Sequence, residues 1–267
     1  MARLTGGINF EGSMDNFSAY KRRDMDVIIL RRKGGASKKQ IQTSDSFVNT
    51  RKLNVEWAGC SMAGKAIRNA IHPLKHLADY NISGFLNAIA KTIQKQDIVS
   101  EYGKRNICFS KYRDALDGFS LNKTQLFDSV FRGSFTYEFF KDTVSAKIDF
   151  SSIWPTIHLS NVRKYPMFRF IACLGIVSDF QYNENLEAYQ PVNIENSSKY
   201  CTLNSEWFYV PKMVEAFSLE LNFDVLPILT DSDSLILGIG IEFGNSIGTQ
   251  IVEPIKCSGS GKILRVN

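Results

Sequence analysis

Residues 167–177 read MFRFIACLGIV, a nearly continuous apolar run that predicts a β-strand. Two further stretches, 144–150 and 217–223, alternate apolar and polar residues with the period of two that is typical of half-buried strands. Residues 235–243 and 262–266 add two more strand-like runs. Because Asn, Ser, Pro and Gly separate these runs, rather than helical patterns, this part of the chain favours an antiparallel β-sandwich over a doubly wound parallel sheet.

Upstream of the strands, residues 47–96 follow a helical pattern. Apolar residues recur there at spacings of three and four, at Ala63, Ala66, Ile67, Ala70, Ile71, Leu74, Leu77 and Ala78. Since each residue turns a helix by about 100°, they share one face. The opposite face is a basic stripe of Lys65, Arg68, His72 and Lys75. Pro73 should kink or divide this helix, because its ring excludes a backbone hydrogen bond.

A second helix is expected over residues 83–96. Its pattern predicts buried side chains at Phe85, Leu86, Ile89 and Ile93, and exposed side chains at Lys91 and Lys95.

Near the N-terminus, residues 16–22 and 27–32 flank a polar turn at 23–26 and predict a basic β-hairpin. Its positive residues are Lys21, Arg22, Arg23, Arg31 and Arg32. Such a hairpin fits either a surface that meets an anionic partner or a solvated edge that its cations protect from aggregation.

The apolar content, 44% of 267 residues, is enough for one large domain or two modest ones. We predict an α+β protein with a basic hairpin and helical module at residues 1–110, followed by a mainly antiparallel, sandwich-like β domain at 111–267. Residues 1–123 hold 21 Lys and Arg against 11 Asp and Glu, a net charge of +10, and residues 124–267 hold 11 against 16, a net charge of −5. This asymmetry indicates either a basic module for an anionic partner or complementary faces through which copies meet.

Five cysteines without any CxxC pair argue against a disulfide scaffold or a zinc finger and favour a reducing compartment. No apolar run approaches the roughly 18 residues needed to span a bilayer. Residues 1–10 lack a basic segment followed by an apolar one. The sequence therefore predicts a soluble, cytoplasmic protein without a membrane span.

Two short segments resemble the metal-binding carboxylate motifs of family B DNA polymerases, DFSSIWP at 149–155 and TDSDS at 230–234. The residues between them lack the basic fingers-helix pattern of that family. We therefore interpret Asp149 as the end of a strand and residues 231–234 as an Asx-rich turn.

Three other motifs fail on spacing or on ligand number. SGSGK at 258–262 lacks the first glycine and the final Ser or Thr of a phosphate-binding loop, and is expected to be a turn that enters the last strand. GIG at 238–240 lies in a strand-like run without a following helix and indicates a bend or bulge. His72 and His76, with Cys60, supply too few ligands for a zinc site. We therefore expect a non-enzymatic protein without catalytic residues, cofactor or metal.

Several longer segments together resemble a functionally uncharacterised protein family that is common in Bacteroidota, often in several copies per genome. These segments are GGINFEGSMDNFSAYKRRDMDVIILRRKGG at 6–35, FVNTRKLNVEWAGCSMAGKAIR at 47–68, KIDFSSIWP at 147–155, GIGIEFGNSIG at 238–248 and ILRVN at 263–267. The resemblance spans nearly the whole chain. It implies an N-terminal hairpin, helices and a C-terminal β domain, and it implies no catalytic residues.

These observations predict a structural protein that self-associates through oppositely charged faces into a particle, tube or filament. The alternative is a protein that binds nucleic acid or another polyanion through its basic N-terminal module. The residues expected in either contact are Lys21, Arg22, Arg23, Arg31, Arg32, Lys65, Arg68 and Lys75. A hydrolase or transferase whose site is built from unpatterned residues is a third class that the sequence leaves open.

Overall fold

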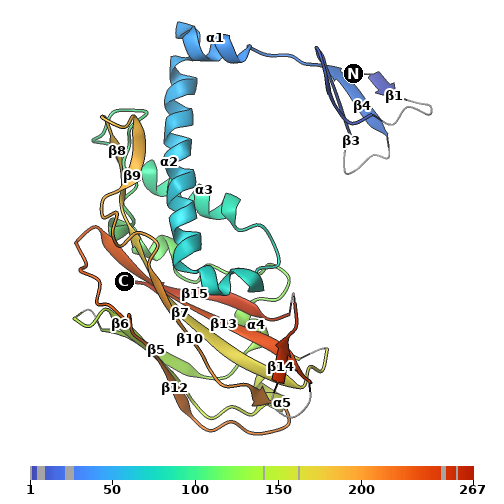
Figure 1. The fold of residues 1–267 in the computed structure, drawn as a ribbon, viewed down its shortest axis with the longest axis vertical. Helices are drawn as coiled ribbons and strands as arrows, with labels where there is room; N and C mark the ends of the chain where they lie inside the picture. Colours follow the sequence, from blue (N-terminus) through green and yellow to red (C-terminus); the bar gives the residue numbers. More distant parts are fainter. Residues whose placement is uncertain are drawn as a thin grey trace. The chain divides into compact units, whose positions relative to one another are not determined.

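The computed structural model describes residues 2–4, 10–21, 27–140, 142–161, 163–247, 251–256 and 258–267 (Figure 1). The chain divides into two compact units, Met1–Arg51 and Lys52–Asn267. This division differs from the boundary near residue 110 that the sequence suggests. The helical segment from Lys52 onwards shares a hydrophobic core with the β-strands that follow it, and so belongs to the same unit.

The first unit contains an antiparallel four-stranded sheet with the order β1-β4-β3-β2. Its strands are β1 (Ala2–Leu4), β2 (Gly12–Met14), β3 (Phe17–Lys21) and β4 (Ile28–Arg32). The pairing of β3 with β4 confirms the predicted hairpin, whereas Arg22, Arg23 and the turn itself lie outside the described residues. The short helix α1 (Lys38–Thr43) follows, and Ser37 and Gln40 cap its start reciprocally. The 3-10 turn η1 (Asp45–Phe47) leads into the next helix.

The predicted helices are confirmed. α2 (Val48–Ala70) begins in the first unit and continues in the second, and α3 is Ser83–Gln94. Pro73 divides the first helical segment as expected, because α2 ends before it and the 3-10 helix η2 (His72–Leu77) contains it in its first turn. Two predictions for α3 are wrong. Phe85 is 47% exposed, and Lys91 is half-buried because it binds the carboxylate of Glu56.

The predicted strands of the second unit are confirmed as parts of two larger sheets. The six-stranded sheet has the order β10-β7-β13-β14, with β11 also on β7 and β15 also on β13. Its strands are β7 (Met167–Ser178), β10 (Tyr200–Asn204), β11 (Phe208–Tyr209), β13 (Asp233–Ile247), β14 (Ile251–Pro254) and β15 (Ser260–Val266). The three-stranded sheet has the order β12-β6-β5 and consists of β5 (Phe135–Phe140), β6 (Ser145–Phe150) and β12 (Phe217–Leu221).

The remaining elements are short. They are η3 (Phe109–Lys111), η4 (Arg113–Leu116), α4 (Phe127–Val130), α5 (Pro155–His158), and the two-stranded ribbon of β8 (Phe180–Asn183) and β9 (Ala188–Pro191).

Two hydrophobic cores lie on the two faces of the six-stranded sheet. On β7, Ile171 and Cys173 pack with the helices, whereas Phe170 and Leu174 pack with the three-stranded sheet. The strand reads as a continuous apolar run because both of its faces are buried. The second unit is therefore layered as helices, six-stranded sheet and three-stranded sheet, which confirms the predicted α+β class (Figure 1).

Glycines on the central strands allow the helical layer to lie close to the sheet. A Cβ atom at Gly175 would lie 2.2 Å from the carbonyl oxygen of Ala70, and one at Gly240 would lie 2.3 Å from Cδ1 of Leu77. The GIG segment at 238–240 also contains the predicted irregularity, because the register with β15 shifts between Leu237 and Gly238.

We predict that Gly175→Ala destabilises the protein by about 1–3 kcal/mol, because the added methyl group overlaps the backbone of α2. Gly84→Ala in α3 is the matched control. A Cβ at Gly84 meets no atom within 4 Å, and alanine is the better helix former by about 1 kcal/mol. Urea denaturation of both variants tests this. Equal stability of the two variants would contradict the proposed close contact.

Candidate functional site

The described basic residues among those predicted from the sequence are divided between the two units. Lys21, Arg31 and Arg32 belong to the first unit, and Lys65, Arg68 and Lys75 to the second. Arg31 lies opposite Ser18 and Arg32 opposite Phe17 in the pairing of β3 with β4. Successive residues of a strand point to opposite faces, so the two arginines lie on opposite faces of the sheet. The guanidinium of Arg31 lies 5.3 Å from the ring centre of Tyr20.

The basic stripe of α2 and η2 is weaker than its sequence suggests. Lys65 and Lys75 are exposed and make no ion pair with any described residue. Arg68 is half-buried, and its Nη1 has no hydrogen-bond partner among the residues that the structure describes. Burial lowers the pKa of this guanidinium. His72 stacks on the ring of Tyr200, with 6.0 Å between the ring centres.

Other cations of the helical layer are neutralised by nearby carboxylates. Lys52 binds Glu101 at 2.8 Å and Lys104 binds Glu184 at 2.7 Å.

The residues of the first unit hold 10 Lys and Arg against 5 Asp and Glu, a net charge of +5. The second unit holds 22 against 22, a net charge of zero. The whole positive excess of the chain therefore belongs to residues 1–51.

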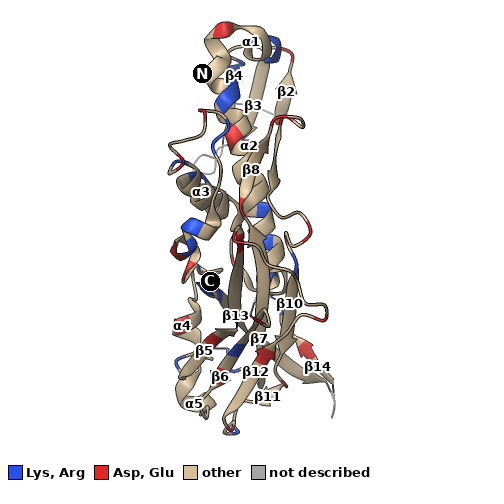
Figure 2. Cartoon of the chain, turned by 90° about the vertical axis from the view of Figure 1, so that its left-hand side faces the viewer, with Lys and Arg blue, Asp and Glu red and all other residues tan. Residues whose placement is uncertain are grey.

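The outer face of the three-stranded sheet gathers acidic residues, which Figure 2 marks in red. The strand register places Glu138 of β5 and Glu220 of β12 directly opposite Lys147 of β6. Asp149 lies two residues further along β6 and therefore on the same face. Lys147 Nζ lies 2.9 Å from Asp149 Oδ1, which also accepts a 2.5 Å hydrogen bond from Ser218 Oγ. The hydrogen bond to Asp149, together with the charges of Asp149, Glu220 and Glu138, raises the pKa of Lys147.

We call Glu138, Lys147, Asp149 and Glu220 the acidic sheet face. Three carboxylates surround one ammonium group, so the face has a net charge of −2. The sequence patterns do not predict this face, because its residues come from three strands and only the strand register brings them together. Alternating charges at 138, 147, 149 and 220 were the available signal.

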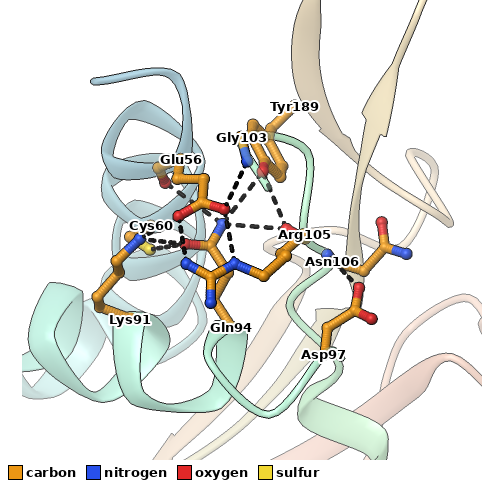
Figure 3. A network of polar contacts seen from close by, with 9 residues as sticks. All are labelled: Glu56, Cys60, Lys91, Gln94, Asp97, Gly103, Arg105, Asn106 and Tyr189. Atoms are coloured by element: carbon orange, nitrogen blue, oxygen red, sulfur yellow. Dashed lines mark hydrogen bonds and ion pairs between the residues drawn. The ribbon is translucent and has the colours of Figure 1, made fainter. Parts of the chain in front are cut away.

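A second cluster of charges is buried between α2, α3 and the loop at 95–105 (Figure 3). Glu56 is fully buried. Its Oε1 accepts hydrogen bonds from the Gly103 N–H at 3.0 Å and from Arg105 Nε at 2.7 Å. Its Oε2 accepts from Lys91 Nζ at 2.6 Å and from Arg105 Nη2 at 2.7 Å. Burial alone would raise the pKa of Glu56, but these donors outweigh it and lower the pKa to about 2.

Neutral side chains extend this buried cluster. Gln94 Nε2 donates to the carbonyl of Arg105 at 3.0 Å and lies 3.2 Å from the Tyr189 hydroxyl of β9. Cys60 donates to Gln94 Oε1 at 3.3 Å, and burial raises the pKa of its thiol to about 11. Both oxygens of Glu56 are occupied by protein donors. The cluster therefore holds α2, α3, the loop and the β8–β9 ribbon together and offers a structural role.

The motifs that resembled catalytic or metal sites have structural partners. Asp233 is buried, and its Oδ2 accepts from the Thr230 N–H at 3.0 Å, as in the Asx-rich turn that the sequence predicts. His76 Nε2 lies 3.1 Å from Glu242 Oε1, so His72, His76 and Cys60 have different partners. No group of three or more His, Cys, Asp or Glu within the described ranges is placed to hold a metal ion. Lys262, the lysine of the SGSGK segment, binds the carboxylate of Asp128 at 2.6 Å and so also has a structural partner.

A cavity of about 320 Å³ lies beside η2, lined in part by Asp79, Asn122, Asn161 and Tyr165. Asp79 accepts hydrogen bonds from the backbone N–H groups of Lys123 and Thr124, which outweigh burial and lower its pKa. Asn161 binds the backbone of Tyr165 at 2.7 Å and 2.9 Å. These polar groups are engaged in holding loops.

Comparisons of the chain with protein-family profiles, curated proteins and solved structures found no match. None of the helices in the described part of the chain is both long and apolar enough to cross a membrane.

We predict that Glu56→Gln destabilises the protein by about 3–5 kcal/mol, because it leaves Arg105 and Lys91 beside a neutral amide. The pKa of Glu56 is lowered from 4.5 to about 2, so its stabilisation is complete above about pH 4.5 and is lost as the pH falls through 2. Thermal unfolding between pH 2 and pH 7 should show this component in the wild type and not in the variant.

Glu101→Gln is the matched control, since Glu101 pairs with Lys52 at the surface. It should leave the melting temperature unchanged. A Glu56→Gln variant as stable as this control would contradict the assignment.

Proposed function

We propose that this protein is a non-enzymatic structural component that self-associates through oppositely charged surfaces. The observation that carries the proposal is the acidic sheet face, where Glu138, Asp149 and Glu220 exceed the charge of Lys147 by two. The first unit, with its net charge of +5, supplies the opposite charge. Attraction between such surfaces steers copies together and fixes their orientation.

The small core of the first unit supports the same proposal. Among its described side chains, the buried apolar residues are Ala19, Ile28 and Ile29. Met14 and Phe17 are 63% and 44% exposed. A sheet of short strands with so little buried apolar surface is marginal by itself. Contact with another copy would bury more of it.

The two charged surfaces are different surfaces of one chain, so a contact between them is heterologous. Each copy can then offer one surface and receive a neighbour at the other. Such contacts close into a ring or continue as a filament.

We propose that the assembly is cytoplasmic, which is supported by the free thiols of Cys60, Cys108, Cys173 and Cys201.

We predict that the purified chain, of 30.2 kDa, forms oligomers at low ionic strength that dissociate as salt rises from about 50 mM to about 500 mM. Glu138→Lys with Glu220→Lys should give monomers at low salt, because the acidic sheet face becomes basic. Light scattering after size-exclusion chromatography measures the mass, and negative-stain electron microscopy shows the form of the assembly.

Glu195→Lys with Glu206→Lys is the matched control, because it reverses two exposed carboxylates outside this face. It should assemble like the wild type. A wild-type chain that stays monomeric at high concentration and low salt would contradict the proposed function.

Polyanion binding is the second candidate, and the pairing of Arg31 with Tyr20 favours it. An exposed arginine beside an aromatic ring can contact phosphate and stack on a base. We predict that single-stranded DNA binds with an affinity that falls steeply with salt, and that Arg31→Glu reduces it about tenfold or more. Fluorescence anisotropy tests this, with Lys65→Glu as the comparison on α2. An unchanged affinity in Arg31→Glu would contradict this second function.

A further inference from the structure

One face of the first unit's sheet carries an exposed row of two apolar residues and a cation. Met14 lies opposite Phe17 in the pairing of β2 with β3, and Phe17 lies opposite Arg32 in the pairing of β3 with β4. All three side chains are exposed. Side chains directly opposite on antiparallel strands are about 5 Å apart at Cβ. The aromatic ring and the guanidinium therefore form one patch.

The outer face of β5 carries a matching combination. Residues 135, 137 and 139 pack against the core, so Thr136, Glu138 and Phe140 point outwards. Phe140 is 43% exposed. Two residues along a strand are about 7 Å apart, so an exposed ring lies beside a carboxylate of the acidic sheet face.

We propose that the Met14–Phe17–Arg32 row of one copy docks on the outer face of β5, β6 and β12 of a second copy. Arg32 then meets Glu138, and Phe17 with Met14 covers Phe140. This inference rests on the proposed function and names its contact surfaces. An arginine can bind a carboxylate with two parallel hydrogen bonds, and the covered rings exclude water from that pair.

Charge and chemistry both favour this pairing. The acidic sheet face has a net charge of −2, and the first unit has a net charge of +5. Charges alone would give a weak contact, because salt screens the attraction between exposed charges that are more than about 8 Å apart. The apolar side chains beside Arg32 and Glu138 give the contact a fixed register. Lys65 and Lys75 on the helical layer form a competing cationic surface. The experiment below distinguishes contact at these two lysines from contact at Arg32.

The full-length chain with Arg32→Glu should self-associate about 100-fold more weakly than the wild type at low salt. Glu138→Arg should weaken association by a similar factor, because it places like charges together. Arg31→Glu is the matched control, since it makes the same charge change on the opposite face of the same sheet. It should weaken association much less. Sedimentation velocity over a range of concentrations measures all three.

Mixing the Arg32→Glu and Glu138→Arg variants gives the decisive result. One contact in the mixture is the wild-type pair, and the other joins Glu at position 32 to Arg at position 138. Two monomeric variants should therefore assemble together into particles of wild-type size. A folding defect in either variant could not produce this rescue.

Three outcomes would overturn the proposal, and they differ from failure of the proposed function. Assembly that persists in both variants would leave self-association intact but place it on other surfaces. Loss of assembly in Lys65→Glu with Lys75→Glu, and not in Arg32→Glu, would assign the contact to the helical layer. An Arg32→Glu variant with a lower melting temperature and unchanged mass would place the contact within one chain. Only a monomeric wild type would overturn the proposed function itself.

Discussion

The second unit depends on the close approach of α2 and η2 to the central strands β7 and β13. Ala70 and Leu77 lie over Gly175 and Gly240, where a side chain would overlap the helical layer. Because the helices occupy that face, the three-stranded sheet packs on the other. Aromatic residues such as Phe150 and Phe170 fill the space between the two sheets. The same arrangement leaves the outer face of the three-stranded sheet with charged and polar residues and the exposed ring of Phe140.

Pairing within the chain decides which charges are left for a partner. Arg105 and Lys91 are committed to the buried carboxylate of Glu56, and these bonds hold the helical layer to the loop behind it. Surface pairs such as Lys52 with Glu101 contribute little to stability, but they also reduce the positive charge of this layer. The net positive charge of residues 1–123 therefore overstates the positive charge that the helical layer has available for a partner. The charges left include the positive excess of residues 1–51, the exposed Lys65 and Lys75, and the negative charge of the acidic sheet face.

Much of the fold could be predicted from local patterns. The period of two in residues 144–150 and the apolar run at 167–177 identify β6 and β7, and Pro73 identifies the end of α2. The other features depend on contacts between residues that are far apart in the sequence, and local patterns do not show such contacts. Lys91 is a surface residue by helical periodicity, yet Glu56, 35 positions earlier, draws it inwards. The acidic sheet face was missed for the same reason, since the strand register alone unites its residues.

Charge segregation and exposed apolar residues have different consequences, and a specific assembly needs both. Opposite charges accelerate encounter and exclude wrong orientations, but water and salt weaken them at an open surface. In the proposed contact, Phe140 beside Glu138 and Phe17 beside Arg32 would remove water from the Arg32–Glu138 pair. A chain that carries the two halves of such a contact on different units gives every copy one of each. Growth then stops only where the relation between successive copies closes on itself, so the geometry between the two units would decide between a ring and a filament.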